Sequence, residues 1–104
     1  NKGVLLALAM NPSSSVDDLT KLSFSRESEV RAAAAANPNT PISTFEFLVL
    51  DLKKPVKLAA IRTLVELSNP TDGSAPDASA LELATKACAS AKTADEKQAC
   101  TQLE

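Results

Sequence analysis

A segment that opens with valine recurs in this chain at a constant spacing of 26 residues. The copies begin at Val4, Val30 and Val56, and each has alanine at its fourth position. The first two copies also end in Asn-Pro. Recurrence at a fixed period of 20 to 50 residues is typical of proteins in which short units stack on one another. The sequence therefore predicts an all-α protein built as a short α-solenoid.

Each unit is expected to consist of two short helical elements joined by a corner. Residues 30–36 are rich in alanine, the best helix former. Asn37-Pro38 should end this helix, because the residue before proline is pushed out of the α region. Thr40 then reads as the N-cap of the next helix, with Pro41 at its first position. Neither element can bury its apolar face alone, so we expect the units to stack.

The second element of each unit has apolar residues at every third position, which indicates a one-sided helix. These residues are in register between the units: Val16, Leu19 and Leu22 fall opposite Ile42, Phe45 and Leu48. The third unit departs from the pattern, since Thr63 stands where Asn-Pro is expected and the helix should run on through Leu67. We therefore divide the chain into a repeat region at 1–70 and a loop with a C-terminal helical hairpin at 71–104.

The run Val-Arg-Ala-Ala-x-Ala-x-Asn-Pro-Asn-Thr-Pro, from Val30 to Pro41, resembles the leucine-rich repeat variant family. The resemblance covers about residues 4–64. It implies α and 3₁₀ helices that alternate in a right-handed superhelix. The founding member of that family also carries an iron–sulfur cluster on a Cys-rich segment. This chain has no such segment, so the resemblance implies no cofactor here.

Two capping boxes follow a loop at residues 69–77. Ser79 with Glu82 predicts a helix to about residue 91, and Thr93 with Glu96 predicts a second helix to the end of the chain. The link between them is short, so the pair should form an antiparallel hairpin that caps the solenoid.

Cys88 and Cys100 each lie six residues from Ala94, in the turn-proximal part of that hairpin. Antiparallel helices could bring them within the roughly 5.5 Å Cα separation that a disulfide needs. The alternative is two small buried thiols that pack as ordinary hydrophobes. A disulfide would place the protein outside the reducing cytosol, in the periplasm or secreted, and free thiols would place it in the cytoplasm.

The residue types that most chemistry requires are scarce. The chain has no His, so Ser-His and Cys-His nucleophile pairs cannot be built. Two Cys do not complete a tetrahedral metal site, and two Gly do not supply a phosphate-binding loop. We expect no catalytic, cofactor-binding or metal-binding residues. No run of 18 apolar residues occurs, so membrane insertion is not expected either.

These observations favour a non-catalytic module that binds another protein or serves as a scaffold, as a piece of a larger protein. Arg31 and Lys57 occupy equivalent positions in adjacent units and are the candidate partner surface, together with the apolar outer face of the first unit. The alternative is nucleic-acid binding through a basic strip of Arg31, Lys53, Lys54, Lys57 and Arg62, and an accessory domain of an enzyme is a third reading. The net charge of −2 gives nucleic acid little support.

The Asn-Pro corners, Asn11-Pro12 and Asn37-Pro38, are interpreted as structural. Each proline leaves nearby backbone groups without a helical partner, and an asparagine amide can bond such groups. The oligomeric state is not fixed by these patterns.

Overall fold

The computed structural model describes residues 2–11, 13–70, 73 and 75–101, and these residues contain seven α-helices and no strand. The predicted all-α class is confirmed. The helices are α1 Lys2–Met10, α2 Val16–Leu22, α3 Ser28–Ala35, α4 Ile42–Leu48, α5 Lys54–Ser68, α6 Ala78–Ala89 and α7 Ala94–Cys100.

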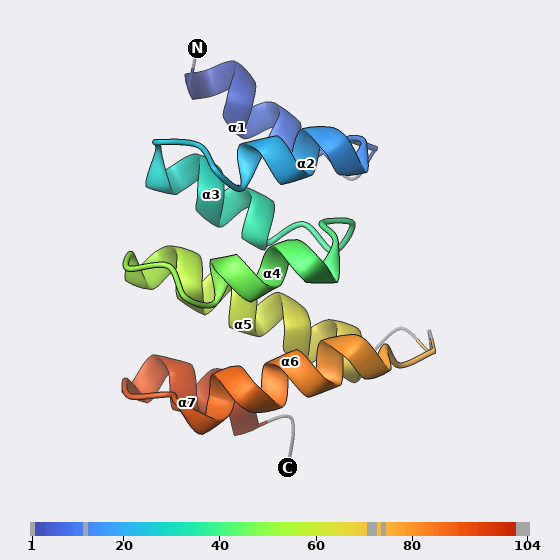
Figure 1. Ribbon diagram of the computed structural model, residues 1–104, viewed down its shortest axis with the longest axis vertical. Coiled ribbons are helices and arrows are strands. Elements are labelled where there is room, and N and C mark those ends of the chain that lie inside the picture. Colours follow the sequence, from blue (N-terminus) through green and yellow to red (C-terminus); the bar gives the residue numbers. More distant parts are fainter. Residues whose placement is uncertain (1, 12, 71–72, 74, 102–104) are drawn as a thin grey trace.

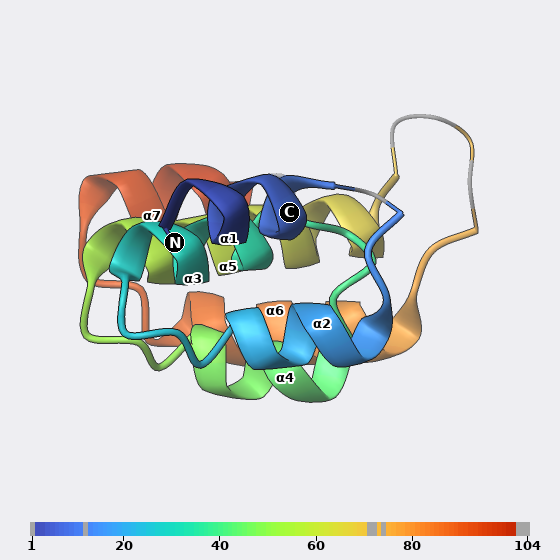
Figure 2. The ribbon, with the colours of Figure 1, turned by 90° about the horizontal axis from the view of Figure 1, so that it is seen from above.

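The helices follow one another in chain order along the longest dimension of the molecule, which is 40 Å (Figure 1). Seen from above, α1, α3, α5 and α7 form one layer, and α2, α4 and α6 form a second layer beside it (Figure 2). The chain therefore changes layer at each connection. Successive helices of one layer, such as α1 and α3 or α3 and α5, contact each other.

Both short helices that precede the third unit are α-helical over seven residues, whereas the family resemblance implies 3₁₀ helices at these places. Ser15 caps α2 by accepting a 3.2 Å hydrogen bond from the Asp18 amide. The predicted cap of α4 is wrong. Pro41 is itself the extended N-cap residue, with φ −61° and ψ 146°, and the Thr40 hydroxyl instead donates a 2.7 Å hydrogen bond to the Ala34 carbonyl.

The larger of two apolar cores surrounds α5, which contacts α3, α4, α6 and α7. The fully or almost fully buried side chains of α5 recur at helical spacing: Val56, Ala60, Ile61, Leu64 and Val65. The predicted continuation of this helix beyond Thr63 is confirmed. The Thr63 hydroxyl donates a 2.9 Å hydrogen bond to the Ala59 carbonyl one turn back, so the side chain fits within the helix instead of ending it.

A smaller core lies between the first helices and α3. Ala9, Leu22, Val30 and Ala34 are buried there, with Leu5 and Leu6 partly buried against them. Val16 does not join either core, although its register partner Ile42 packs against the larger one.

The connection after α5 contains Gly73 at φ +86°, a left-handed conformation that favours glycine. The expected loop is confirmed for its described residues, while Thr71, Asp72 and Ser74 lie outside them. Asp77 caps α6 by accepting a 3.1 Å hydrogen bond from the Ala80 amide, so the predicted cap Ser79 is wrong. An aspartate two residues earlier already satisfies the first turn.

The second predicted capping box is confirmed at the start of α7. The Thr93 hydroxyl accepts from the Glu96 amide, and the Glu96 carboxylate accepts from the Thr93 amide in return. Within the described part of the chain, no helix combines the length and the apolar character needed to cross a membrane.

Candidate protein-binding surface

The corner residue Asn37 is buried, and its side chain joins the end of α3 to the end of α1. Its Nδ2 donates 3.0 Å hydrogen bonds to the carbonyls of Ala9 and Asn11, and its Oδ1 accepts one from the Asn39 amide. Every polar atom of this side chain is therefore used inside the protein. The structural interpretation of Asn37 agrees with these contacts.

Asn11, the equivalent residue of the first corner, is exposed. Its Oδ1 accepts a 2.9 Å hydrogen bond from the Ser13 amide, which matches the local bond of Asn37. Pro38 is exposed next to the second corner, and Pro12 lies outside the described residues.

Arg31 forms an internal ion pair instead of facing solvent freely. Its Nε donates a 2.7 Å hydrogen bond to Oδ2 of Asp51, and its Nη1 donates to the carbonyls of Ser25 and Arg26. Burial alone would raise the pKa of Asp51, but the hydrogen bond from Arg31, the bond from the Lys53 amide and the nearby positive charges lower it. Arg31 thus links the chain before α3 to the chain before α5.

Lys57 is likewise paired, with Glu96 of α7. Its Nζ lies 3.1 Å from Oε1 of Glu96, although this buried oxygen accepts no well-directed hydrogen bond. The Glu96 side chain is only 4% exposed. The hydrogen bond from Thr93 lowers the pKa of Glu96, burial opposes this, and the contact with Lys57 adds to the lowering. Arg31 and Lys57 therefore hold the stack together, and neither is a free surface charge.

These ion pairs divide the basic strip that the sequence suggests. Lys53, Lys54 and Arg62 are exposed, whereas Arg31 and Lys57 are partly buried against carboxylates. The structure thus does not bring five free cations to one face, and phosphate binding gains no support from the geometry.

Cys88 of α6 and Cys100 of α7 are joined by a disulfide in the structure. Both are only partly exposed, and both pack against the core around α5. The bond ties the last helix to the helix of the other layer that precedes it.

An apolar patch lies where α2 and α4 end. It consists of Phe24, Phe47, Leu50 and Leu52, of which Phe24 and Phe47 are each 60% exposed, Leu50 is 76% exposed and Leu52 is fully exposed. The two rings meet edge to face, with centroids 5.6 Å apart. Large apolar side chains that gather on a surface mark interaction sites, because burying them against a partner is favourable.

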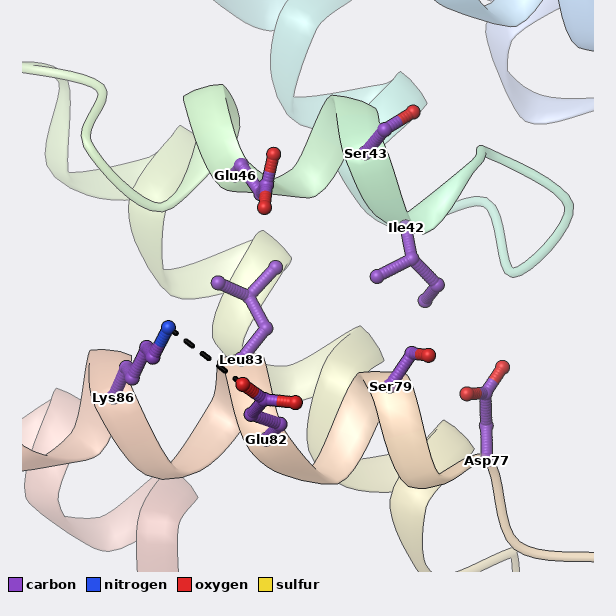
Figure 3. A pocket seen from close by; sticks show the side chains of 8 residues that line it. All are labelled: Ile42, Ser43, Glu46, Asp77, Ser79, Glu82, Leu83 and Lys86. Atoms are coloured by element: carbon purple, nitrogen blue, oxygen red, sulfur yellow. Dashed lines mark ion pairs between the residues drawn. The ribbon is translucent and has the colours of Figure 1, made fainter.

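A groove runs between α4 and α6, and its first part is drawn in Figure 3. Its second part reaches Leu50 of the patch. Its first part, of about 400 Å³, is lined by Ile42 and Glu46 from α4 and by Glu82, Leu83 and Lys86 from α6, with Asp77 at the start of α6. Ile42 points toward α6 and Leu83 toward α4 (Figure 3). Glu46, Leu83 and Lys86 also line the second part, which continues to Leu50. We call the two parts together the α4–α6 groove.

The apolar outer face of the first unit, the other surface suggested by the sequence, is also exposed at Val4, Leu8 and Met10. It contains no aromatic side chain, and none of the described grooves is lined by it.

Neither the patch nor the groove was identified from the sequence, although the sequence contains the evidence that Phe47 is exposed. Phe45 and Leu48 are buried and Ile42 is partly buried on one face of α4, and Phe47 lies two residues from Phe45, on the opposite side of a helix. Its exposure could have been inferred. The contact between Phe47 and Phe24, which belongs to another 26-residue segment, could not have been inferred.

Among the residues that the structure describes, no three His, Cys, Asp or Glu side chains are grouped so that they could hold a metal ion. Searches of protein-family models, of curated proteins and of solved structures find no match to this chain.

Proposed function

We propose that the chain is a non-catalytic protein-binding module, built as a short right-handed α-solenoid of 26-residue units with a C-terminal hairpin cap. The observation that carries the binding function is the exposed edge-to-face pair of Phe24 and Phe47, beside the exposed Leu50 and Leu52. Aromatic side chains in the centre of an interface supply a large share of its binding energy.

Two pairs of equivalent hydrogen bonds and one bond between the corners support the proposal of a 26-residue unit. The Ser14 hydroxyl donates to the Leu8 carbonyl, and 26 residues later the Thr40 hydroxyl donates to the Ala34 carbonyl. The Oδ1 atoms of the two corner asparagines accept equivalent bonds from amides two residues downstream. A fifth bond, from Asn37 Nδ2 to the carbonyl of Asn11, joins residues 26 apart. Equivalent bonds at equivalent positions are what stacked copies of one unit would form.

A comparison of equivalent positions supports the binding role of Phe47. In the preceding unit its place is taken by Lys21, which is exposed as well. A position that accommodates a solvated lysine in one unit does not need an aromatic ring for folding in the next. An apolar ring kept in water at such a position is better explained by a partner that covers it.

The disulfide between Cys88 and Cys100 supports a location in an oxidising compartment, because such bonds persist in the periplasm or outside the cell. It would stabilise the proposed cap, where many of the buried side chains are alanines. Two reactive thiols in the native purified protein would contradict this part of the proposal.

The experiment compares two double variants with the unchanged chain. Phe24→Ser with Phe47→Lys removes the aromatic pair of the patch, and the second change copies the residue found at the equivalent position. Val4→Ser with Met10→Ser is the matched control, since these two side chains are similarly exposed, at 59% and 70%, but lie on α1. Each protein is used to capture partners from an extract of the source cells, and a captured partner is then purified and titrated.

We expect the patch variant to bind the purified partner at least about tenfold more weakly, since hot-spot aromatics each contribute about 2 kcal/mol or more. The control should bind like the unchanged chain. Equal binding by all three proteins would refute the assignment of the patch. Loss in the α1 variant alone would move the binding surface to the first unit.

A further inference from the structure

The α4–α6 groove adds a charge pattern to the apolar patch. Three carboxylates line it, those of Glu46, Asp77 and Glu82, against the single amine of Lys86. Lys86 lies 3.8 Å from Glu82, and both side chains are about three quarters exposed, so this pair is weak. None of the ion pairs among the described residues involves Glu46 or Asp77. The groove is therefore net negative.

The lining of the groove is apolar where the two helices approach each other and at its far end. Ile42 and Leu83 are both partly buried and face one another between α4 and α6 (Figure 3). Val49, Leu50 and Ala87 form the end that meets the apolar patch. An occupant must therefore supply apolar side chains here.

The sign of the surface changes beyond Leu50. The adjoining hollow is lined by Leu50 and Leu52, by three lysines and by the carboxylates of Asp51 and Glu96. Both carboxylates and Lys57 are held in ion pairs, so the exposed charges here are those of Lys54 and Lys92. Leu50 of the apolar patch thus lies between the acidic groove and the hollow with the two exposed lysines. This asymmetry would fix the orientation of a bound peptide along the groove, because the basic residues of the peptide are attracted only toward the acidic groove.

We propose that the α4–α6 groove binds a peptide segment of a partner protein that carries Lys or Arg beside large apolar residues. The basic side chains lie toward Asp77 and Glu46, and an apolar side chain lies against Leu83 and Leu50. This inference rests on the proposed function, since it assigns the class of segment that the protein-binding module takes. A segment with acidic residues in the same place would be repelled by the three carboxylates.

The test uses a library of random peptides displayed on phage, selected on the full chain with its disulfide intact. Selected peptides are then synthesised with a fluorescent label, and their affinity is measured by anisotropy at low and high salt. We expect the selected sequences to combine positive charge with Leu, Ile, Phe or Trp. Their affinity should fall as salt is raised, because exposed charges are screened.

Two charge-reversed variants locate the binding. Glu46→Lys with Glu82→Lys changes the groove, and lysine is as good a helix former as glutamate at these exposed positions. Glu29→Lys with Glu66→Lys makes the same change in net charge on α3 and α5, in the other layer (Figure 2). Circular dichroism establishes first that each variant keeps its helix content and melting temperature.

The groove variant should bind the selected peptides at least about tenfold more weakly than the unchanged chain, while the control changes by less than about threefold. Equal weakening by both variants would reduce the effect to net charge and overturn the proposal. Selection of neutral or acidic peptides, or of none, would overturn it as well. In each of these cases the patch function stands if partner binding still depends on Phe24 and Phe47, so the two failures are distinguishable.

Discussion

Replacement of Asn37 by alanine should destabilise the protein far more than the same replacement at Asn11. Asn37 is 4% exposed, and its side chain makes three hydrogen bonds with backbone groups, one of them to Ala9 in α1 and one to Asn11 at the preceding corner. At about 1 kcal/mol for each bond, Asn37→Ala should lower the free energy of unfolding by about 3 kcal/mol. The carbonyl of Ala9 belongs to a fully buried residue, so water would replace its lost partner poorly.

Asn11→Ala is the matched control. That side chain is exposed and accepts one local bond from Ser13, whose amide water can reach after the change, so the expected loss is about 0.5 kcal/mol. Asn37→Asp separates the donor bonds from the acceptor bond. It keeps an oxygen for the Asn39 amide but places a buried carboxylate against two carbonyls, so it should cost more than alanine.

Urea unfolding followed by circular dichroism measures these differences, with the midpoint shift interpreted at a common m-value. Equal losses of stability in Asn11→Ala and Asn37→Ala would refute the reasoning, because the larger loss at Asn37 is attributed to the hydrogen bonds that its side chain donates to Ala9 and Asn11. An Asn37→Asp variant more stable than Asn37→Ala would show that the two donated bonds do not matter.

The remaining predictions concern the ion pairs, the disulfide and phosphate binding. Lys57→Met leaves Glu96 buried without its cation and should cost about 2 kcal/mol at neutral pH, discounted from the 3–5 kcal/mol of a fully buried pair because Lys57 is 26% exposed. The pKa of Glu96 in the folded protein is lowered from its ordinary value of 4.5. The stability that the ionised side chain contributes is therefore present above pH 4.5 and is lost as the pH falls through the lower pKa of the folded state. Urea titrations at several pH values should show that Lys57→Met loses less stability on acidification than the unchanged chain does. Arg31→Glu should lower the urea midpoint of unfolding, because it places a second carboxylate against that of Asp51. We therefore do not expect an effect on partner binding alone. Cys88→Ser with Cys100→Ser should cost about 3 kcal/mol, from the loop-closure entropy of a bridge between residues 12 apart. Nucleic-acid binding, if present, should weaken steeply in a salt titration, and no binding at low salt would eliminate it.

The sequence was sufficient for those parts of the fold that depend on local physics. Periodic apolar residues located the helices, and the continuation of α5 through Thr63 followed from the missing Asn-Pro corner. The exact caps were harder. Thr40 and Ser79 each stand in a favourable sequence position, but Pro41 and Asp77 are the N-cap residues of α4 and α6. At α6 two cap-forming side chains were available, and Asp77 is the one used. At α4 no side chain caps the helix, because the Thr40 hydroxyl bonds the Ala34 carbonyl instead.

The candidate site was less predictable, because it depends on contacts between units. Because Arg31 and Lys57 occupy equivalent positions, the sequence suggested that they lie on a common face. That comparison identifies no carboxylate partner for either residue, so both were expected to be solvated. Their acceptors, Asp51 and Glu96, are not equivalent: the first precedes α5 and the second lies in α7.

The same comparison of units is more informative where the residue types disagree. Asn11 and Asn37 agree in type because one local bond recurs at both corners. Lys21 and Phe47 disagree at an exposed position, where stacking imposes no requirement on the side chain. Agreement between units therefore identifies what the fold needs, and disagreement at an exposed position identifies where a function can be added. On that criterion Phe47, with Phe24 against it and Leu50 nearby in the lining of the groove, is a position where a function can be added to this fold.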